Sequence, residues 1–160
     1  MTAWTAPRTW VAGELVTASI MNTHVRDNLL HAKEQVNIAL DRALVIGFGD
    51  TAGSVLTTGV KGYIYCPFAG AITGWTLVAD ASGNLVVDVW KDVWANFPPT
   101  VADTIAGTEK PTLSGAQKAQ DLSLTTWTTA IADGDVLAFK VDSAATVKQA
   151  TLTLSVLVSG

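Results

Sequence analysis

Cysteine, histidine and charged side chains are scarce in this sequence, and each shortage excludes a class of chemistry. The single cysteine, Cys66, permits no intramolecular disulfide and no metal site built from several thiolates. Because its neighbours are aromatic and aliphatic, we expect it to be a small core residue. Only 15% of the residues are charged and 49% are hydrophobic. The surface must therefore consist largely of Thr, Ser, Ala and Gly, which suits assembly into a larger object.

Arginine is absent after Arg42, and the charge is unevenly distributed. Residues 1–49 hold four acidic and four basic side chains, whereas the rest holds ten acidic and six basic ones and thus the whole net charge of −4. A negatively charged part without arginine binds phosphate backbones poorly. We therefore expect no nucleic-acid partner.

The sequence also lacks an apolar run of signal-peptide or membrane-span length. We therefore expect synthesis in a cytoplasm and no membrane insertion. Any position outside the cell would then be reached by another route, such as lysis.

The sequence pattern changes near Gly47, from heptads to short alternating segments. Residues 1–16 predict an irregular arm that contains Trp4 and Trp10. Two tryptophans carry a large apolar area, which is costly to leave in water. They either fold back on the chain's own helix or dock into a partner, and the sequence leaves both alternatives open.

Residues 17–46 predict a helical stalk. Thr17 is a favourable N-cap, and the absence of Gly and Pro before Gly47 predicts a helix to about Leu44. A four-three spacing of apolar residues marks a coiled-coil-like seam, although a helix packed on its own head would show a similar pattern. The seam favours self-association without choosing between two and three strands. Its predicted members are Val25, Leu29, Ala32, Val36, Ala39 and Ala43.

Residues 47–160 predict an antiparallel β-sandwich or jelly roll, so that the chain is mainly β with one helix before the head. Apolar and polar residues alternate in several short segments, which indicates strands with one buried face. Tight turns are expected at 82–84 and 133–135, and a long loop at 93–120. The expected strands are 55–58, 60–68, 72–79, 85–91, 122–129, 136–141 and 147–158.

The histidines and carboxylates do not form a catalytic or metal-binding pattern. His24 and His31 are seven residues apart on the expected outward face of the helix, where a solvated histidine is ordinary. Phosphate-binding loops, dinucleotide-binding glycine motifs and calcium-binding loops are all missing from the sequence. We therefore predict no enzyme activity, no catalytic residue, no cofactor and no metal.

Two carboxylate pairs have the residue types of a glycosidase site. Asp88 and Asp92 fall on one face of an expected strand, but that face is expected to be solvated. Asp133 and Asp135 flank a turn glycine, and turn chemistry accounts for them.

The aromatic residues around position 94 have the character of a binding site. Trp94 and Phe97 could stack on sugar rings while Asn96 supplies hydrogen bonds. The alternative is that Trp90 belongs to the core and the other rings cap the sandwich. A carbohydrate-binding or glycan-degrading protein is therefore a second functional class.

Two parts of the sequence resemble a known family. PRTWVAGELVTA at 7–18, followed by MNTHVRDNL at 21–29, resembles the N-terminal attachment segment of many tailed-bacteriophage virion proteins of tail-fibre, head-fibre and minor structural type. The stretches GWTLVAD at 74–80, VDVWK at 87–91 and NFPPTV at 96–101 are similar to the β-rich module that often follows it.

This resemblance implies a homotrimeric, non-enzymatic structural protein on the virion surface. The arm and helix would fasten to other virion proteins of the capsid or tail, with Trp4, Arg8 and Trp10 as the expected attachment residues, while the sandwich faces outward. Host attachment, with a surface polysaccharide as candidate ligand, is the leading function. Because the chain stops after one head module, capsid decoration or a head fibre is the alternative.

Overall fold

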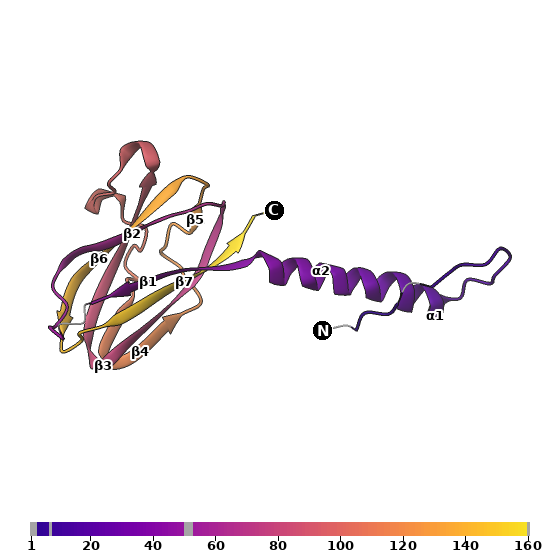
Figure 1. The fold of residues 1–160 in the computed structure, drawn as a ribbon, viewed down its shortest axis with the longest axis horizontal. Helices are drawn as coiled ribbons and strands as arrows, with labels where there is room; N and C mark the ends of the chain where they lie inside the picture. Colours follow the sequence, from indigo (N-terminus) through magenta and orange to yellow (C-terminus); the bar gives the residue numbers. More distant parts are fainter. Residues whose placement is uncertain (1–2, 7, 50–52, 160) are drawn as a thin grey trace. The chain divides into compact units, whose positions relative to one another are not determined.

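The structure, a computed structural model, describes residues 3–6, 8–49 and 53–159, with the backbone alone at 37–39 (Figure 1). The chain divides into two compact units, Met1–Asp41 and Arg42–Gly160. None of the helices in the described part is both long enough and apolar enough to cross a membrane.

The first unit contains one helix built from three consecutive segments. They are α1 (Ala18–Met21), the π-helical turn η1 (Asn22–Arg26) and α2 (Asp27–Leu40). The side chain of Thr17 accepts a hydrogen bond from the backbone N–H of Ile20 at 3.3 Å. This cap confirms the predicted start of the helix.

The helix ends at Leu40, earlier than expected, because strand β1 (Asp41–Phe48) follows it directly. Leu44 and Phe48 are buried in the core of the head, and β1 lies beside β7 in the sheet. Sheet pairing thus overrides a helical period that continues into this segment. Ala43 consequently lies on a strand, and its assignment to the helical seam is wrong.

The second unit is mainly β, as predicted, and its antiparallel sheet curls on itself (Figure 1). The strand order is β1-β7-β3-β6-β2, and β4 and β5 also pair with β3. The remaining strands are β2 (Gly59–Tyr65), β3 (Gly70–Val93), β4 (Thr112–Asp121), β5 (Ala130–Ile131), β6 (Asp135–Ala145) and β7 (Ala150–Val158).

The long strand β3 organises the head, because its first half pairs with β7 and its second half with β6. The change of partner falls near Gly83, where an added Cβ would lie 2.5 Å from the backbone oxygen of Ala145. Only glycine fits this close approach. The tight turn predicted at 82–84 is therefore wrong, since the strand continues through it.

The core confirms the alternation predicted for the C-terminal strand. Leu152, Leu154 and Val156 on β7 are buried, while Thr151 and Thr153, which alternate with them, are partly exposed. A side-chain period of two puts these sets on opposite faces of the sheet. The same alternation buries Leu137 and Phe139 on β6.

Three further expectations are wrong in part. The expected loop 93–120 contains all but the last residue of β4 (Thr112–Asp121), and the expected strand 122–129 is irregular and followed only by the short β5. No strand forms at 55–58 among the described residues. The turn at 133–135 is confirmed, with a positive φ of 91° at Gly134.

Candidate functional site

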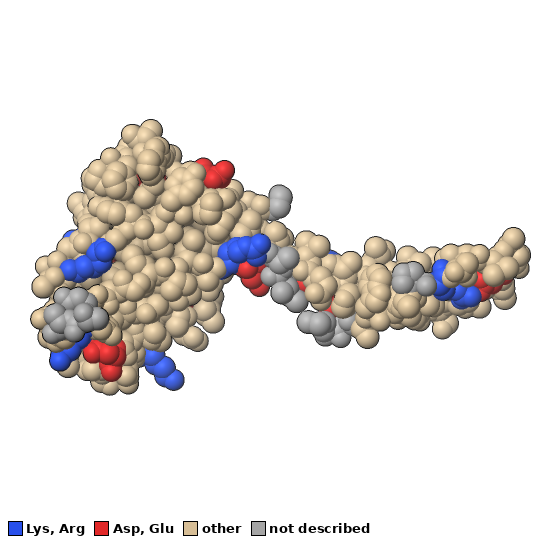
Figure 2. Space-filling view, viewed as in Figure 1, with Lys and Arg blue, Asp and Glu red and all other residues tan. Residues whose placement is uncertain are grey.

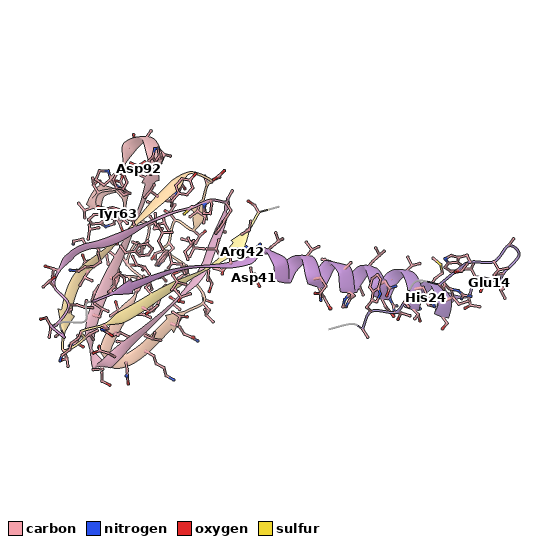
Figure 3. All side chains as sticks on the ribbon, in the orientation of Figure 1. Glu14, His24, Asp41, Arg42, Tyr63 and Asp92 are labelled. Carbon is pink, nitrogen blue, oxygen red and sulfur yellow. The ribbon has the colours of Figure 1, made fainter. Side chains whose placement is uncertain are left out.

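Four exposed aromatic side chains gather on the head, and we name Tyr63, Tyr65, Trp94 and Phe97 the aromatic cluster. The ring centroids of Tyr63 and Phe97 are 4.9 Å apart with an interplanar angle of 62°. Those of Tyr65 and Trp94 are 6.2 Å apart at 82°, and those of Trp94 and Phe97 are 6.0 Å apart at 28°. Figure 3 labels Tyr63 at this end of the head.

Regular backbone structure holds both halves of the cluster. Tyr63 and Tyr65 point to one side of β2, which pairs along its length with β6. Trp94 opens the 3-10 turn η2 (Trp94–Asn96), and its N–H donates to the backbone oxygen of Gly134 at 3.2 Å. The N–H of Phe97 donates to the oxygen of Trp94 at 3.2 Å. Each ring is thus attached to hydrogen-bonded backbone.

A polar pair lies beside these rings. Asp92 Oδ1 accepts a hydrogen bond from the N–H of Val93 at 2.7 Å and another from Asn96 Nδ2 at 3.1 Å. An ionised carboxylate only accepts hydrogen bonds, so the group of Asn96 that faces Asp92 is its amide nitrogen. Among the described residues the Asn96 carbonyl oxygen accepts no hydrogen bond, so it can accept from a ligand. An open depression of about 450 Å³ lies between Tyr65, Trp94 and Gly134.

The structure brings together the residues predicted to bind a ligand and adds two more. Trp94, Asn96 and Phe97 are exposed and adjacent, as expected. Sequence reasoning missed Tyr63 and Tyr65, although their spacing by two on an expected strand already put them on one face. Which loop would lie beside that face depended on tertiary structure.

Trp90 is separate from this surface. Its ring is buried, and the ammonium of Lys140 lies 5.8 Å from the ring centroid. The alternative reading of Trp90 as a packing residue is therefore confirmed, while the neighbouring aromatic rings remain exposed.

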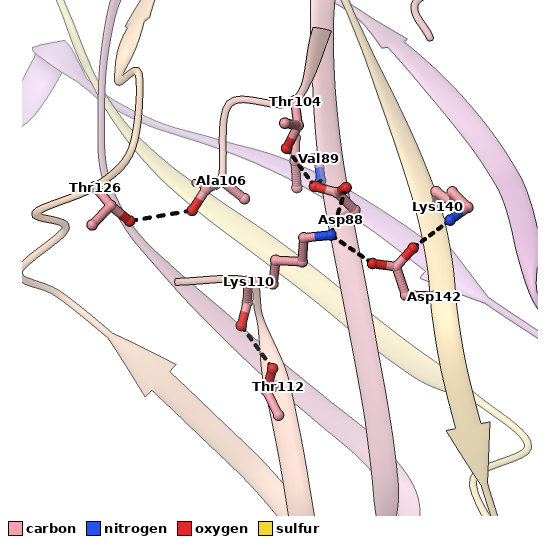
Figure 4. A network of polar contacts seen from close by, with 9 residues as sticks. All are labelled: Asp88, Val89, Thr104, Ala106, Lys110, Thr112, Thr126, Lys140 and Asp142. Carbon is pink, nitrogen blue, oxygen red and sulfur yellow. Dashed lines mark hydrogen bonds and ion pairs between the residues drawn. The ribbon is translucent and has the colours of Figure 1, made fainter. Parts of the chain in front are cut away.

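Asp88 is buried rather than solvated, which corrects the sequence expectation (Figure 4). Its Oδ2 lies 2.9 Å from the Lys110 ammonium, and its Oδ1 accepts from the hydroxyl of Thr104 at 2.7 Å. Lys110 also lies 2.7 Å from Asp142 Oδ2, and Asp142 pairs with Lys140. Hydrogen bonds to Asp142 and Asp88 raise the pKa of Lys110. We name the five connected residues the Asp88 network: Asp88, Thr104, Lys110, Lys140 and Asp142.

Two other titratable groups of the head, Asp135 and Cys66, are also buried. Asp135 is buried and lies 3.1 Å from the ammonium of Lys91, so turn chemistry is not its full explanation. Burial raises the pKa of the Cys66 thiol to about 11, in agreement with its expected core position. In the part of the chain that the structure describes, no group of three or more His, Cys, Asp or Glu side chains could hold a metal ion.

In the first unit, the arm lies on the helix through Asn28. The side chain of Asn28 is buried, accepts from the N–H of Thr5 at 3.0 Å and donates to the oxygen of Thr5 at 2.9 Å. The ring of Trp4 lies 5.8 Å from that of His31. The arm thus folds back on its own helix, yet Trp4 remains 52% exposed.

The predicted attachment residues Arg8 and Trp10 contact one another. The Arg8 guanidinium lies 5.0 Å from the centroid of the Trp10 ring, a cation–π contact, and also pairs with Glu14. Trp10 remains 46% exposed. Both tryptophans of the arm therefore present ring surface to solvent, while the N–H groups of the adjacent Thr5 and Val11 donate to the side chains of Asn28 and Glu14.

The histidines lie on the side of the helix that the arm covers. His24 is partly buried, and its Nδ1 is buried with no hydrogen-bond partner among the described residues. His31 packs near Trp4. The spacing of His24, Asn28 and His31 puts all three on one helix face. The prediction that both histidines are solvated is therefore wrong.

The helical part of the predicted seam forms an exposed apolar stripe. Val25, Leu29 and Val36 are exposed, Leu29 by 65%, and Ala32 lies between them on the same stripe. The side chain of Ala39, also predicted in the seam, lies outside the described residues. We name Val25, Leu29, Ala32 and Val36 the apolar stripe.

Comparison with known proteins identifies no family. No protein-family model matches the chain, and no curated protein matches it. A chain in the structure of the infectious bursal disease virus Gx strain is similar at 14% identity with a TM-score of 0.22. That similarity covers 74% of this chain and 37% of the viral chain, so this chain spans little more than a third of its length.

Proposed function

We propose that this chain is a non-enzymatic structural protein of a tailed-bacteriophage virion, fastened by its first unit and presenting the β head for host attachment. The observation that carries the proposal is the exposed apolar surface of the first unit. Trp4, Trp10, Leu29 and Val36 are each close to half exposed or more. Exposed patches of this kind mark interaction surfaces in soluble proteins.

In this proposal the apolar stripe and the two tryptophans of the arm contact different partners. The apolar stripe has the four-three spacing of a coiled-coil seam, so it packs against identical helices. The resemblance of the N-terminal segment to phage attachment segments supports three copies. Trp4 and Trp10 instead dock into a capsid or tail protein, because large aromatic anchors dominate many interfaces.

The polar interior of the head supports a non-enzymatic role. The buried carboxylates of Asp88 and Asp135 are both paired with lysines, so neither is an open acid or base facing a cleft. The exposed aromatic cluster favours host attachment over capsid decoration. Exposed apolar patches mark binding sites, and host attachment requires a binding site on the head. The protein would be made in the host cytoplasm, released by lysis and carried on the virion surface.

Immunogold labelling of purified virions with an antibody against the head tests the proposal. Label at the tail or at fibre tips is the expected result. Label spread over the capsid would instead assign decoration, and unlabelled virions would overturn both alternatives.

A variant lacking residues 1–16 gives an independent test of attachment. Its head should stay folded, because the second unit has its own core of buried side chains. It should fail to join particles, and Trp10→Ala should lower occupancy, since truncating such an anchor commonly costs about 2 kcal/mol. The matched control Val11→Ala removes a smaller exposed side chain and should keep most of the occupancy.

A further inference from the structure

We infer that the aromatic cluster binds an uncharged glycan, with Tyr65 and Trp94 forming the main stacking site and Asn96 a hydrogen-bonding group beside it. The inference rests on the proposed function, since it names the class of host ligand that the head would contact. It adds Tyr63 and Tyr65 to a site that the sequence limited to the η2 region.

The chemistry of the rings favours a sugar. An aromatic face carries partial negative charge, and the C–H bonds on one face of a pyranose ring carry partial positive charge. Trp94 is 66% exposed and Tyr65 is 50% exposed, so both rings present surface on which a sugar could stack. Their interplanar angle of 82° gives two walls of the depression rather than one flat apolar patch. That shape suits one saccharide unit better than the broad face of a protein.

Polar groups at the edge of the rings match hydroxyl groups. The carbonyl oxygen of Asn96 can accept a hydrogen bond from a sugar hydroxyl, and the phenol groups of Tyr63 and Tyr65 can donate or accept. Because Asp92 holds the Asn96 amide at 3.1 Å, little side-chain freedom is lost on binding.

The charge distribution favours a neutral ligand over an anionic one. None of the four rings belongs to a charged residue, and the nearby Lys91 is already paired with Asp135. Figure 2 shows no Lys or Arg on the lobe of the head that residues 94–104 form in that view. An anionic polymer would therefore meet no cation on this lobe in that view, and Asp92 would repel it.

Binding of the full-length protein to a panel of neutral hexasaccharides of glucose, galactose, mannose and N-acetylglucosamine tests the inference. The readout is tryptophan fluorescence together with calorimetry, and polygalacturonate serves as the anionic comparison. At least one neutral glycan should bind saturably. Trp94→Ala and Tyr65→Ala should each weaken that binding about tenfold or more, the size of effect that one stacking ring has in single-stranded nucleic-acid binding.

Two control variants separate stacking from general damage. Trp94→Phe keeps an aromatic face and should retain most of the affinity, whereas Leu157→Ala removes an exposed apolar side chain from β7 and should leave affinity unchanged. The inference is overturned if no neutral glycan of the panel binds, if only polygalacturonate binds, or if the two ring-to-alanine variants bind normally.

Failure of this inference is distinguishable from failure of the proposed function. A trimer that labels virions but binds no neutral glycan would refute the ligand class alone. A protein that binds a neutral glycan through Trp94 yet is absent from virions would refute the proposed function and leave the site intact.

Discussion

The ammonium of Lys110 lies 2.9 Å from the buried carboxylate of Asp88 and joins the segment before β4 to the middle of β3. Asp88 is only 1% exposed, so Lys110 supplies the counter-charge to a carboxylate that is removed from solvent. Thr104, from the same connecting segment, donates a second side-chain hydrogen bond to it. The connection between β3 and β4 is thus held against the sheet by polar contacts rather than left as a free loop.

Replacing Lys110 with methionine should destabilise the head by about 2 kcal/mol. The change removes the counter-charge of a buried carboxylate, which costs about 3–5 kcal/mol when both partners are buried. The loss is smaller here because the Lys110 side chain is partly exposed and Asp88 keeps Thr104. Urea unfolding measures the change. Lys118→Met, at an exposed position on β4, is the control and should shift stability by less than about 0.5 kcal/mol. Equal unfolding free energies for the two variants would contradict the role given to Lys110.

Glu109 should make the stability of the head dependent on acid pH. Hydrogen bonds from the side chain of Thr125 and from the backbones of Thr126 and Thr125 lower the pKa of its carboxyl from 4.5 to about 2. A carboxyl with a lower pKa in the folded state contributes stability above about pH 4.5, and this contribution is lost as the pH falls toward 2. Melting temperatures measured from pH 7 to pH 2 should therefore converge between wild type and Glu109→Gln.

The control for that experiment is Asp133→Asn, an exposed carboxyl on the turn before β6. This variant should follow the wild-type pH profile at every pH. If Glu109→Gln also follows it, the contacts of Glu109 with Thr125 and Thr126 do not stabilise the ionised carboxyl.

The sequence predicted those elements whose local pattern agrees with their tertiary setting. Thr17 caps the helix because capping is a local contact, and Leu152 and Leu154 are buried because period-two alternation requires only one buried face. The end of the helix could not be found this way. The heptad pattern runs on into β1, and only pairing with the distant β7 makes Leu44 a strand residue.

The candidate site was predictable in its contiguous part only. Trp94, Asn96 and Phe97 are close in sequence, so their proximity needed no tertiary information. Tyr63 and Tyr65 joined them because the backbone of Trp94 bonds to Gly134, at the turn before the strand that pairs with β2. Asp88 was wrongly expected on a solvated face. Its partner Lys110 is distant in sequence, in a segment expected to be a loop, so no local pattern indicated the contact.

Full-length protein should sediment as a trimer, and charges on the apolar stripe should dissociate it. Leu29→Asp with Val36→Asp brings like charges together where the proposed seam packs, so we expect a monomer with a folded head. Gln35→Glu adds a charge at an exposed position outside the stripe and should leave the trimer intact. Analytical ultracentrifugation and circular dichroism measure both properties. A monomeric wild type at micromolar concentration would contradict the seam.

Asn28 should control how firmly the arm is held on the helix. Asn28→Ala removes both hydrogen bonds to Thr5, each worth about 1 kcal/mol, and should raise the population of the released arm about tenfold or more. A protease binds its substrate as a free extended segment, so we expect trypsin to cut after Arg8 faster when the arm leaves the helix. The rate of that cleavage, followed by mass spectrometry, then reports the release. The melting temperature of the head should stay unchanged, because Arg42–Gly160 form a separate unit. Asn22→Ala, at an exposed position on the same helix, is the control and should be cut at the wild-type rate. Equal rates for Asn28→Ala and Asn22→Ala would mean that Trp4 and Arg8, rather than Asn28, hold the arm.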